Sequence, residues 1–174
     1  MNRTVLAALA LVAAVATPAA AGTGYTGNKD VALTLQGDVS PRCGIVGAPG
    51  GGVDLGSLNG RGGARLAFEI DCNEPVAYTL VSANGGLTNV DLEGEAPRGF
   101  AAGVAYSAAV EAPKAGFSGV AHDSRSLVGA GRGGTGTAVP FKSAFAVRLA
   151  WNADAPLMAG RYQDVLTLRI AGGS

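Results

Sequence analysis

Hydrophobic and polar residues alternate along several stretches of this chain, and a period of two indicates a β-strand with one buried face. The clearest stretches are LAFEIDC at 66–72, AFAVRLAW at 144–151 and YQDVLTLRI at 162–170. Weaker alternation predicts strands at VALTLQ (31–36), VAYTLVSA (76–83) and GVAYSAAV (103–110). The inward positions of the three clearest strands are Leu66, Phe68, Ile70 and Cys72, then Phe145, Val147, Leu149 and Trp151, then Leu166, Leu168 and Ile170.

Glycine-rich segments separate these stretches, and the chain holds 28 glycines. The segments are GAPGGG at 47–52, NGRGG at 59–63, NGG at 84–86, EGEAPRG at 93–99 and VGAGRGGTGTAVP at 128–140. They predict turns and loops. Beyond the first 21 residues, no window has apolar residues at the three-to-four spacing of a helix. The sequence therefore predicts an all-β chain that folds as a sandwich or a barrel.

The first residues, MNRTVLAALALVAAVATPAAA, combine a basic Arg3, an apolar run and an end of small residues. This is the pattern of a secretory signal peptide at 1–21, and it predicts an exported protein. A membrane anchor is the alternative, although the apolar run at 5–15 is shorter than the roughly 20 residues that a spanning helix needs. The mature chain, 22–174, has the size of one domain.

Charge in the mature chain is close to balanced. When Arg3 is removed with the leader, 12 of the 13 basic residues remain against 13 acidic residues, and they are scattered along the chain. Neither nucleic acid nor an anionic membrane is therefore expected as a partner.

The chain has two cysteines, Cys43 and Cys72, an even number in a protein expected to reach an oxidising compartment. We expect them to form one disulfide, which would stabilise the fold by roughly 3.6 kcal/mol on the chain-entropy model. A two-thiolate metal site is the alternative, but His122 is the only histidine and lies far along the chain.

A glycine pattern of the type found in dinucleotide sites occurs without the context that such a site needs. Gly129, Gly131 and Gly134 fit G-x-G-x-x-G, but the segment leads to Pro140 and a further strand pattern. A dinucleotide site requires a helix at that point. We therefore expect a loop that joins two strands, and no cofactor.

The run His122-Asp123-Ser124 holds the residue types of a hydrolase triad. Neighbours in sequence point in divergent directions, so these three side chains cannot form the relay among themselves. We expect a polar surface loop between Pro113 and Gly129, and we do not expect an enzyme.

Two pairs of carboxylates and a few aromatic residues remain. Glu69 and Asp71 share one strand face and are expected to be solvated outer-face charges, with a shared proton or a cation as the alternative. Glu93 and Glu95 lie in a predicted loop without the sequence motif of a calcium site. Most aromatic residues fall on inward faces. The candidates for a sugar-stacking surface are Tyr25, Phe100 and Phe117.

The order of these parts resembles that of the spore-coat-U-like pilins, the subunits of archaic chaperone-usher pili. The resemblance rests on VALTLQGDVSPRCGI, VDLGSLNG, RLAFEIDCNEPVAYTLVSANGG, VAYSAAVEAP, TAVPF and MAGRYQDVLTLRI, which span nearly all of the mature chain. Its most specific parts are the first cysteine after an alternating N-terminal strand, the second cysteine at the end of an alternating strand, and the terminal A-G-x-Y-x-D followed by alternating apolar residues. Each part is short, so order and spacing carry the argument.

The resemblance implies an all-β, immunoglobulin-like (pilin-type) β-sandwich that lacks its last strand and has an apolar groove beside the C-terminal strand. The residues expected to line this acceptor groove are Tyr162, Leu166, Leu168 and Ile170. The segment 22–36 would be the donor strand of a neighbouring subunit, and 37–174 the domain. The donor side chains would be Val31, Leu33 and Leu35, whose period of two aims them into one groove. The alternative is that these three residues belong to the subunit's own first strand.

The partners implied are a periplasmic chaperone, an outer-membrane usher and neighbouring pilin subunits, with strand addition as the physical mechanism. The expected function is that of a structural subunit of a surface fibre that serves adhesion or biofilm formation. The expected path is through the periplasm to a cell-surface fibre or secretion. The second hypothesis is a secreted or tip adhesin of the same fold, whose loops at 87–99 and 113–136 bind a glycan or a surface ligand.

Overall fold

The computed structural model describes residues 30–48 and 50–173. The chain divides into two units, Met1–Gly37 and Asp38–Ser174. In the first unit, the described residues 30–37 form no strand and are exposed. The predicted signal peptide at 1–21 lies outside the described residues. No helix in the described ranges is long and apolar enough to cross a membrane.

The second unit is built from strands and two short 3₁₀ turns. The strands are β1 (Cys43–Val46), β2 (Arg61–Cys72), β3 (Val76–Ser82), β4 (Leu87–Asn89), β5 (Gly103–Val104), β6 (Tyr106–Ala112), β7 (Phe117–Asp123), β8 (Arg132–Thr135), β9 (Ser143–Asn152), β10 (Tyr162–Gln163) and β11 (Leu166–Gly172). The 3₁₀ turns are η1 (Pro113–Ala115) and η2 (Ser124–Leu127).

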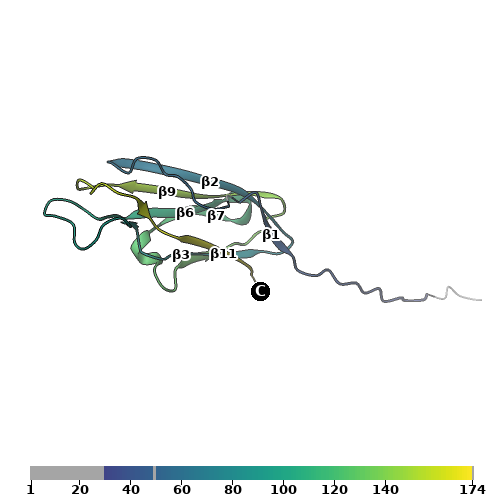
Figure 1. Cartoon of the computed structure of the whole chain (residues 1–174). Helices are drawn as coiled ribbons and strands as arrows, with labels where there is room; N and C mark the ends of the chain where they lie inside the picture. Colours follow the sequence, from purple (N-terminus) through teal and green to yellow (C-terminus); the bar gives the residue numbers. More distant parts are fainter. Residues whose placement is uncertain (1–29, 49, 174) are drawn as a thin grey trace, which may run out of the picture. The chain divides into compact units, whose positions relative to one another are not determined.

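The strands form three antiparallel sheets, with the orders β1-β2-β9-β6-β7, β11-β3-β8 and β10-β4-β5. Figure 1 shows β2, β9 and β6 in one layer and β3 beside β11 in the other. The prediction of an all-β sandwich is confirmed. The strand predicted at 144–151 is β9, which lies between β2 and β6 in the first sheet.

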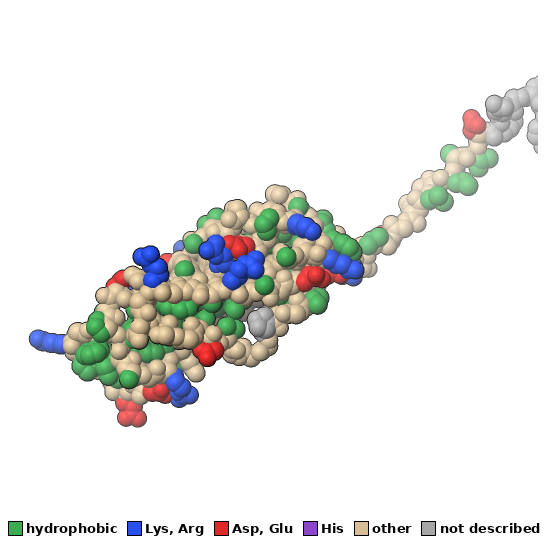
Figure 2. Space-filling view, turned by 90° about the horizontal axis from the view of Figure 1, so that it is seen from above, with side chains coloured by type: hydrophobic (Ala, Val, Ile, Leu, Met, Phe, Trp, Pro, Cys, Tyr) green, Lys and Arg blue, Asp and Glu red, His purple; other side chains and the backbone are tan. Residues whose placement is uncertain are grey.

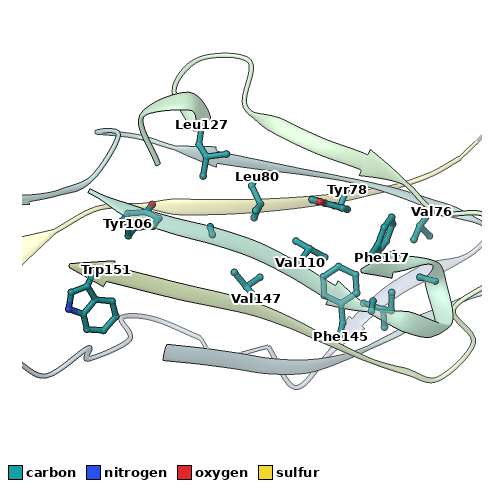
Figure 3. Packing of buried hydrophobic residues seen from close by; sticks show 14 of the residues in the cluster. Val76, Tyr78, Leu80, Tyr106, Val110, Phe117, Leu127, Phe145, Val147 and Trp151 are labelled. Carbon is teal, nitrogen blue, oxygen red and sulfur yellow. The ribbon is translucent and has the colours of Figure 1, made fainter. Parts of the chain in front are cut away.

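The core lies between these layers and is filled by the inward side chains that the alternation identified. Phe145, Val147 and Trp151 of β9 are buried, as are Ile70 and Cys72 at the end of β2. Figure 3 shows the cluster as a continuous row, with Phe117 and Phe145 toward one end and Trp151 at the other. The ring of Phe117 meets those of Tyr78 and Phe145 edge to face, at centroid distances of 4.8 Å and 6.1 Å.

Two glycine-rich segments that predicted turns contain strands instead. Residues 61–63 begin β2, and residues 132–135 form β8 against β3. In β8, a Cβ on Gly133 would meet the Tyr78 carbonyl oxygen at 1.9 Å, so only glycine allows this close pairing. In β2, the indole of Trp151 lies over Gly62 and occupies the place of its absent side chain. Glycine marks close packing here, and not only turns.

The segment between Pro113 and Gly129 is also more regular than predicted, because it holds β7 and η2 in place of a polar surface loop. Conversely, VALTLQ at 31–36 forms no strand in the structure. It is therefore not a first strand of the described sheets.

Cys43 and Cys72 are joined by a disulfide, as predicted. They are opposite residues of β1 and β2, so the bond closes the end of the sheet where β1 begins. Next to it, the Asn73 side chain accepts a hydrogen bond from the Arg42 backbone N–H and donates one to the Ser40 carbonyl oxygen. The chain is thus fixed to the sandwich from Ser40 onward.

The first strand stops after four residues, and the sequence explains why. If the register of β1 against β2 continued, Gly47 would lie opposite Phe68 and Gly52 opposite Gly63. The segment GAPGGG at 47–52 opposes this, because glycine weakens strands and proline cannot donate to the ladder. Gly47 also has a φ of +70°, which leaves the strand conformation. Among the described residues, the first half of β2 consequently has no neighbouring strand on this side.

Candidate functional site

The last strand, β11, lies at an edge of its sheet. Of the strands that the structure describes, it pairs with β3 alone, in a register that puts Leu166 opposite Ser82 and Gly172 opposite Val76. Hydrogen bonds from the Ala83 N–H to the Val165 carbonyl and from the Gly173 N–H to the Pro75 carbonyl fix which residues face β3. In an antiparallel pair these residues alternate. The odd-numbered residues of β11 therefore bond to β3, and the even-numbered ones direct their backbone groups outward.

These outward backbone groups belong to the residues whose side chains point inward. Leu166, Leu168 and Ile170 are half-buried on the inner face, whereas Thr167 and Arg169 are exposed on the outer face. Within the described part of the chain, no residue hydrogen-bonds to the backbone of Leu166, Leu168 or Ile170 on that edge. The edge therefore has a row of free N–H and C=O groups, which is a template for another strand.

The first half of β2 offers a second open edge across the sandwich. The Ala153 N–H donates to the Gly60 carbonyl, so the even-numbered residues of β2 bond to β9. The odd-numbered ones face the other way, and β1 pairs with them only from Glu69 onward. Of the residues that the structure describes, none pairs with Gly63, Arg65 or Ala67 on this side.

Between these two edges the core is incompletely covered. Leu66 and Phe68 of β2 and Leu166, Leu168 and Ile170 of β11 are half-buried and pack against the buried cluster. We call these five residues, with the two strand edges that carry them, the acceptor cleft. Three of the four predicted groove residues, Leu166, Leu168 and Ile170, belong to it.

The fourth predicted groove residue, Tyr162, lies on β10 beside one end of the acceptor cleft. There a cavity of about 1000 Å³ opens between the two layers. Its walls include Leu66, Leu149 and Trp151 on one side and Tyr162 and Leu166 on the other. Residues 51–59, which connect β1 to β2 and which we call the strap, form a further wall.

A partly buried carboxylate fixes the start of β11. Asp164 accepts hydrogen bonds from the Ser82 and Tyr106 hydroxyls, each at 2.6 Å, and from the backbone N–H of Asn84 at 3.0 Å. Burial and the bond to Asp164 raise the pKa of the Tyr106 phenol well above its ordinary value. The phenol therefore stays a hydrogen-bond donor at physiological pH. This network joins β11 to β3 and β6 and holds the acceptor edge in position.

The rest of the terminal A-G-x-Y-x-D pattern fixes β10. The Tyr162 hydroxyl donates to the carbonyl oxygens of Met158 and Ala101, at 2.8 and 3.2 Å. Arg161 forms an ion pair with Asp91 at 2.7 Å, and this hydrogen-bonded pair lowers the pKa of the Asp91 carboxyl. The pattern is thus a set of anchors that lead the chain into β11. Sequence reasoning missed Asp91 and Ser82, which carry no motif of their own.

The predicted donor side chains point to solvent. Val31 and Leu33 are each 78% exposed, and Leu35 is 90% exposed. Figure 2 shows the apolar side chains of this extended segment without cover. Three large hydrophobic residues at every second position of this segment are therefore exposed.

The other predicted candidates fall into structural roles or outside the described residues. Phe117 is buried in the core, so its assignment to a sugar-stacking surface is wrong. The reason is that β7, which the sequence did not predict, aims this ring inward against Tyr78. Phe100 is 49% exposed in the loop after β4, and Tyr25 lies outside the described residues.

The three residues of the apparent triad have different neighbours in the fold. Ser124 is buried, and its Oγ donates to the Gly85 carbonyl while it accepts from the Tyr106 N–H. Asp123 accepts from the Arg125 N–H and caps η2. His122 lies on β7, opposite Ala108 of β6. Each of the two hydrogen-bonding side chains serves the local fold.

The glycines of the G-x-G-x-x-G pattern lie in and before β8, and two of the carboxylates considered above lie on β2. Gly129 and Gly131 have positive φ values of 77° and 75° in the turn before β8, and Gly134 lies in β8 itself. Asp71 lies 3.5 Å from the Arg42 guanidinium, and Glu69 is exposed on the outer face of β2.

No protein-family model matches the chain, and a search of curated proteins gives no match either.

Proposed function

We propose that this chain is a structural subunit of a chaperone-usher surface pilus, an immunoglobulin-like pilin that assembles by donor-strand exchange. The observation that carries the proposal is the acceptor cleft, where two strand edges are open and the inward leucines of β11 are only half-buried. An added strand bonds to the free backbone groups of Leu166, Leu168 and Ile170, and its alternate side chains complete the core.

The occupant of the cleft in a fibre is the segment 30–37 of a second copy of the chain. Its three exposed apolar residues recur at the spacing of a strand's single face, which suits a cleft lined by leucines. Burial of each such side chain contributes about 1.5–3 kcal/mol. Before assembly, a periplasmic chaperone supplies the strand, and an outer-membrane usher receives the complex. The fibre then serves adhesion or biofilm formation.

The test is fibre assembly by a Leu33→Asp, Leu35→Asp double variant with the wild-type sandwich. Charged side chains in an apolar cleft are strongly disfavoured, so we expect assembly to be lost. Thr34→Asp is the matched control, because alternation places residue 34 on the opposite face of the same segment, and it should assemble. Unchanged assembly of the double variant would contradict the donor assignment.

A groove-side variant separates donor from acceptor. Leu168→Asp should abolish acceptance of a strand but leave the variant's own segment 30–37 able to enter a wild-type cleft, so it should cap fibres in mixtures. Glycan binding by a monomer that never polymerises would favour the adhesin hypothesis instead, for which Phe100 is the exposed aromatic residue.

A further inference from the structure

The strap, residues 51–59, partly covers the cavity at one end of the acceptor cleft. Leu55 and Leu58 are its half-buried members and pack against the core cluster, whereas the other strap residues are exposed. Val53 in the same segment is 41% exposed. Two leucines are therefore its apolar anchors.

The strap is not joined to either open edge by backbone hydrogen bonds. Its hydrogen bonds are local, from the Gly56 N–H to Asp54 and from the Asn59 N–H to Ser57. No backbone bond links residues 51–59 to β2 or β11. Removal of the strap from the cleft would thus break no strand ladder, and Leu55 and Leu58 are the only strap residues that it would newly expose.

The connection is also longer than its path requires. Val46 lies opposite Glu69, so the way back to Gly60 at the start of β2 is about 30 Å along the strand. The 14 residues from 46 to 60 reach about 48 Å when extended. A Cβ at Gly50, Gly52 or Gly56 would meet none of the described atoms within 4 Å. The connection is therefore long enough for the strap to move aside, and its glycines allow the backbone to change direction.

In the wall of this cavity, a buried polar group of the described residues has no hydrogen-bond partner. Trp151 lines the same cavity and is 5% exposed, and its Nε1–H is buried with no hydrogen-bond acceptor among the described residues. A buried donor of this kind costs free energy. A strand that enters the cavity brings backbone carbonyl oxygens, which are the acceptors that this N–H lacks.

We propose that the strap is a displaceable cover of the acceptor cleft, held by Leu55 and Leu58, which moves aside when a strand is inserted. This inference rests on the proposed function. The cover shields the open end of the core in the free subunit and competes with the incoming strand. The strap therefore sets the rate of strand insertion, and the β11 edge provides the binding energy.

The experiment mixes the monomeric full chain with a synthetic peptide of residues 30–37, DVALTLQG, and follows the fluorescence of Trp151, the only tryptophan. A Leu55→Ser, Leu58→Ser variant should take up the peptide about tenfold faster, which corresponds to 1.4 kcal/mol. Val53→Ser is the matched control, because Val53 is exposed and is not among the residues packed against the core cluster, and it should match the wild type.

A second variant acts in the opposite direction without removing an apolar contact. Gly50→Ala with Gly52→Ala stiffens the hinge at positions that have open space and no positive φ, and it should slow uptake about two- to fivefold. If the peptide binds but both variants take it up at the wild-type rate, or each variant changes the uptake rate in the direction opposite to the one expected for it, the strap is not a cover. The proposal of an acceptor cleft is then unaffected. If the peptide binds to no form of the chain, the proposed function fails and the cover with it.

Discussion

Removal of the Asp164 carboxylate should loosen the acceptor edge, because this partly buried group joins β11 to β3 and β6. Asp164→Ala deletes two short hydrogen bonds, from Ser82 and Tyr106, and leaves the Tyr106 hydroxyl buried beside a gap. A hydrogen bond to a charged group contributes about 1.5–3 kcal/mol. Two such bonds give an expected loss of about 3–5 kcal/mol, because losses within one network are not additive.

The assay is urea and thermal unfolding of the disulfide-intact protein. A loss of this size should lower the unfolding temperature by about 10 °C or more for a domain of this length. Asp154→Ala is the matched control, because its carboxylate accepts one exposed bond from Asn152, and it should stay within about 0.5 kcal/mol of the wild type.

Two further variants test the reasoning within the network. Asp164→Asn keeps one acceptor oxygen, so it should lose less stability than Asp164→Ala. Tyr106→Phe should destabilise the wild type but add little in the Asp164→Ala background, because its partner is already gone. If Asp164→Ala unfolds like Asp154→Ala, the network does not hold β11, and the structural reading of the terminal motif is wrong.

Three other changes have expected outcomes. Replacement of Cys43 and Cys72 by serine should lower the free energy of unfolding by about 3.6 kcal/mol, from the 29-residue separation that the disulfide closes; equal urea midpoints with and without the bond would contradict this. Gly133→Ala should detach β8 from β3 and lower the free energy of unfolding by at least about 1–3 kcal/mol, because its Cβ would clash with the Tyr78 carbonyl. Gly44→Ala in β1 should be close to neutral, because a Cβ there meets no described atom within 4 Å. Circular dichroism and thermal unfolding compare the two variants. The Asp91–Arg161 pair lowers the pKa of Asp91, so its contribution to the free energy of unfolding is present above the ordinary pKa of an aspartate and is lost as pH falls through the lowered value. The difference in stability between wild type and Asp91→Asn should therefore become smaller on acidification. A difference that becomes larger would contradict a lowered pKa.

Alternation in the sequence predicted the strands that build the core. In β2, β9 and β11, the predicted inward residues are the ones that the structure buries or half-buries, because the two-residue period follows directly from the pleat. The cysteine pairing was also predicted. The strand prediction depends on a local pattern, and the disulfide prediction on the presence of two cysteines, which allow only one pairing.

The strands that the sequence did not predict are those with weak local preference. The segment at 132–135 is rich in glycine and reads as a turn, and only the contact between Gly133 and the Tyr78 carbonyl shows why glycine is needed there. In β7, Phe117 is the one large apolar residue that is buried, because Val120 is exposed, so no apolar alternation marks the strand. Tertiary packing decides both cases.

The candidate site was likewise predicted only in part from the sequence. Leu166, Leu168 and Ile170 followed from the period of β11, but the strap could not be foreseen from VDLGSLNG. Its position depends on where β1 stops and on the return path to Gly60, and these are properties of the whole sheet. The partners of Asp164 are likewise separated from it by 58 and 82 residues.

Amide hydrogen exchange along β11 tests the central claim most directly, with the isolated subunit compared to the assembled fibre. In the isolated subunit, the amides of Leu166, Leu168 and Ile170 should exchange fast, whereas those of Thr167 and Arg169, which face β3, should be protected. On assembly, the three fast amides should become as slow as their neighbours. Protection of all five amides in the isolated subunit, with no change on assembly, would contradict an open edge that a second chain completes.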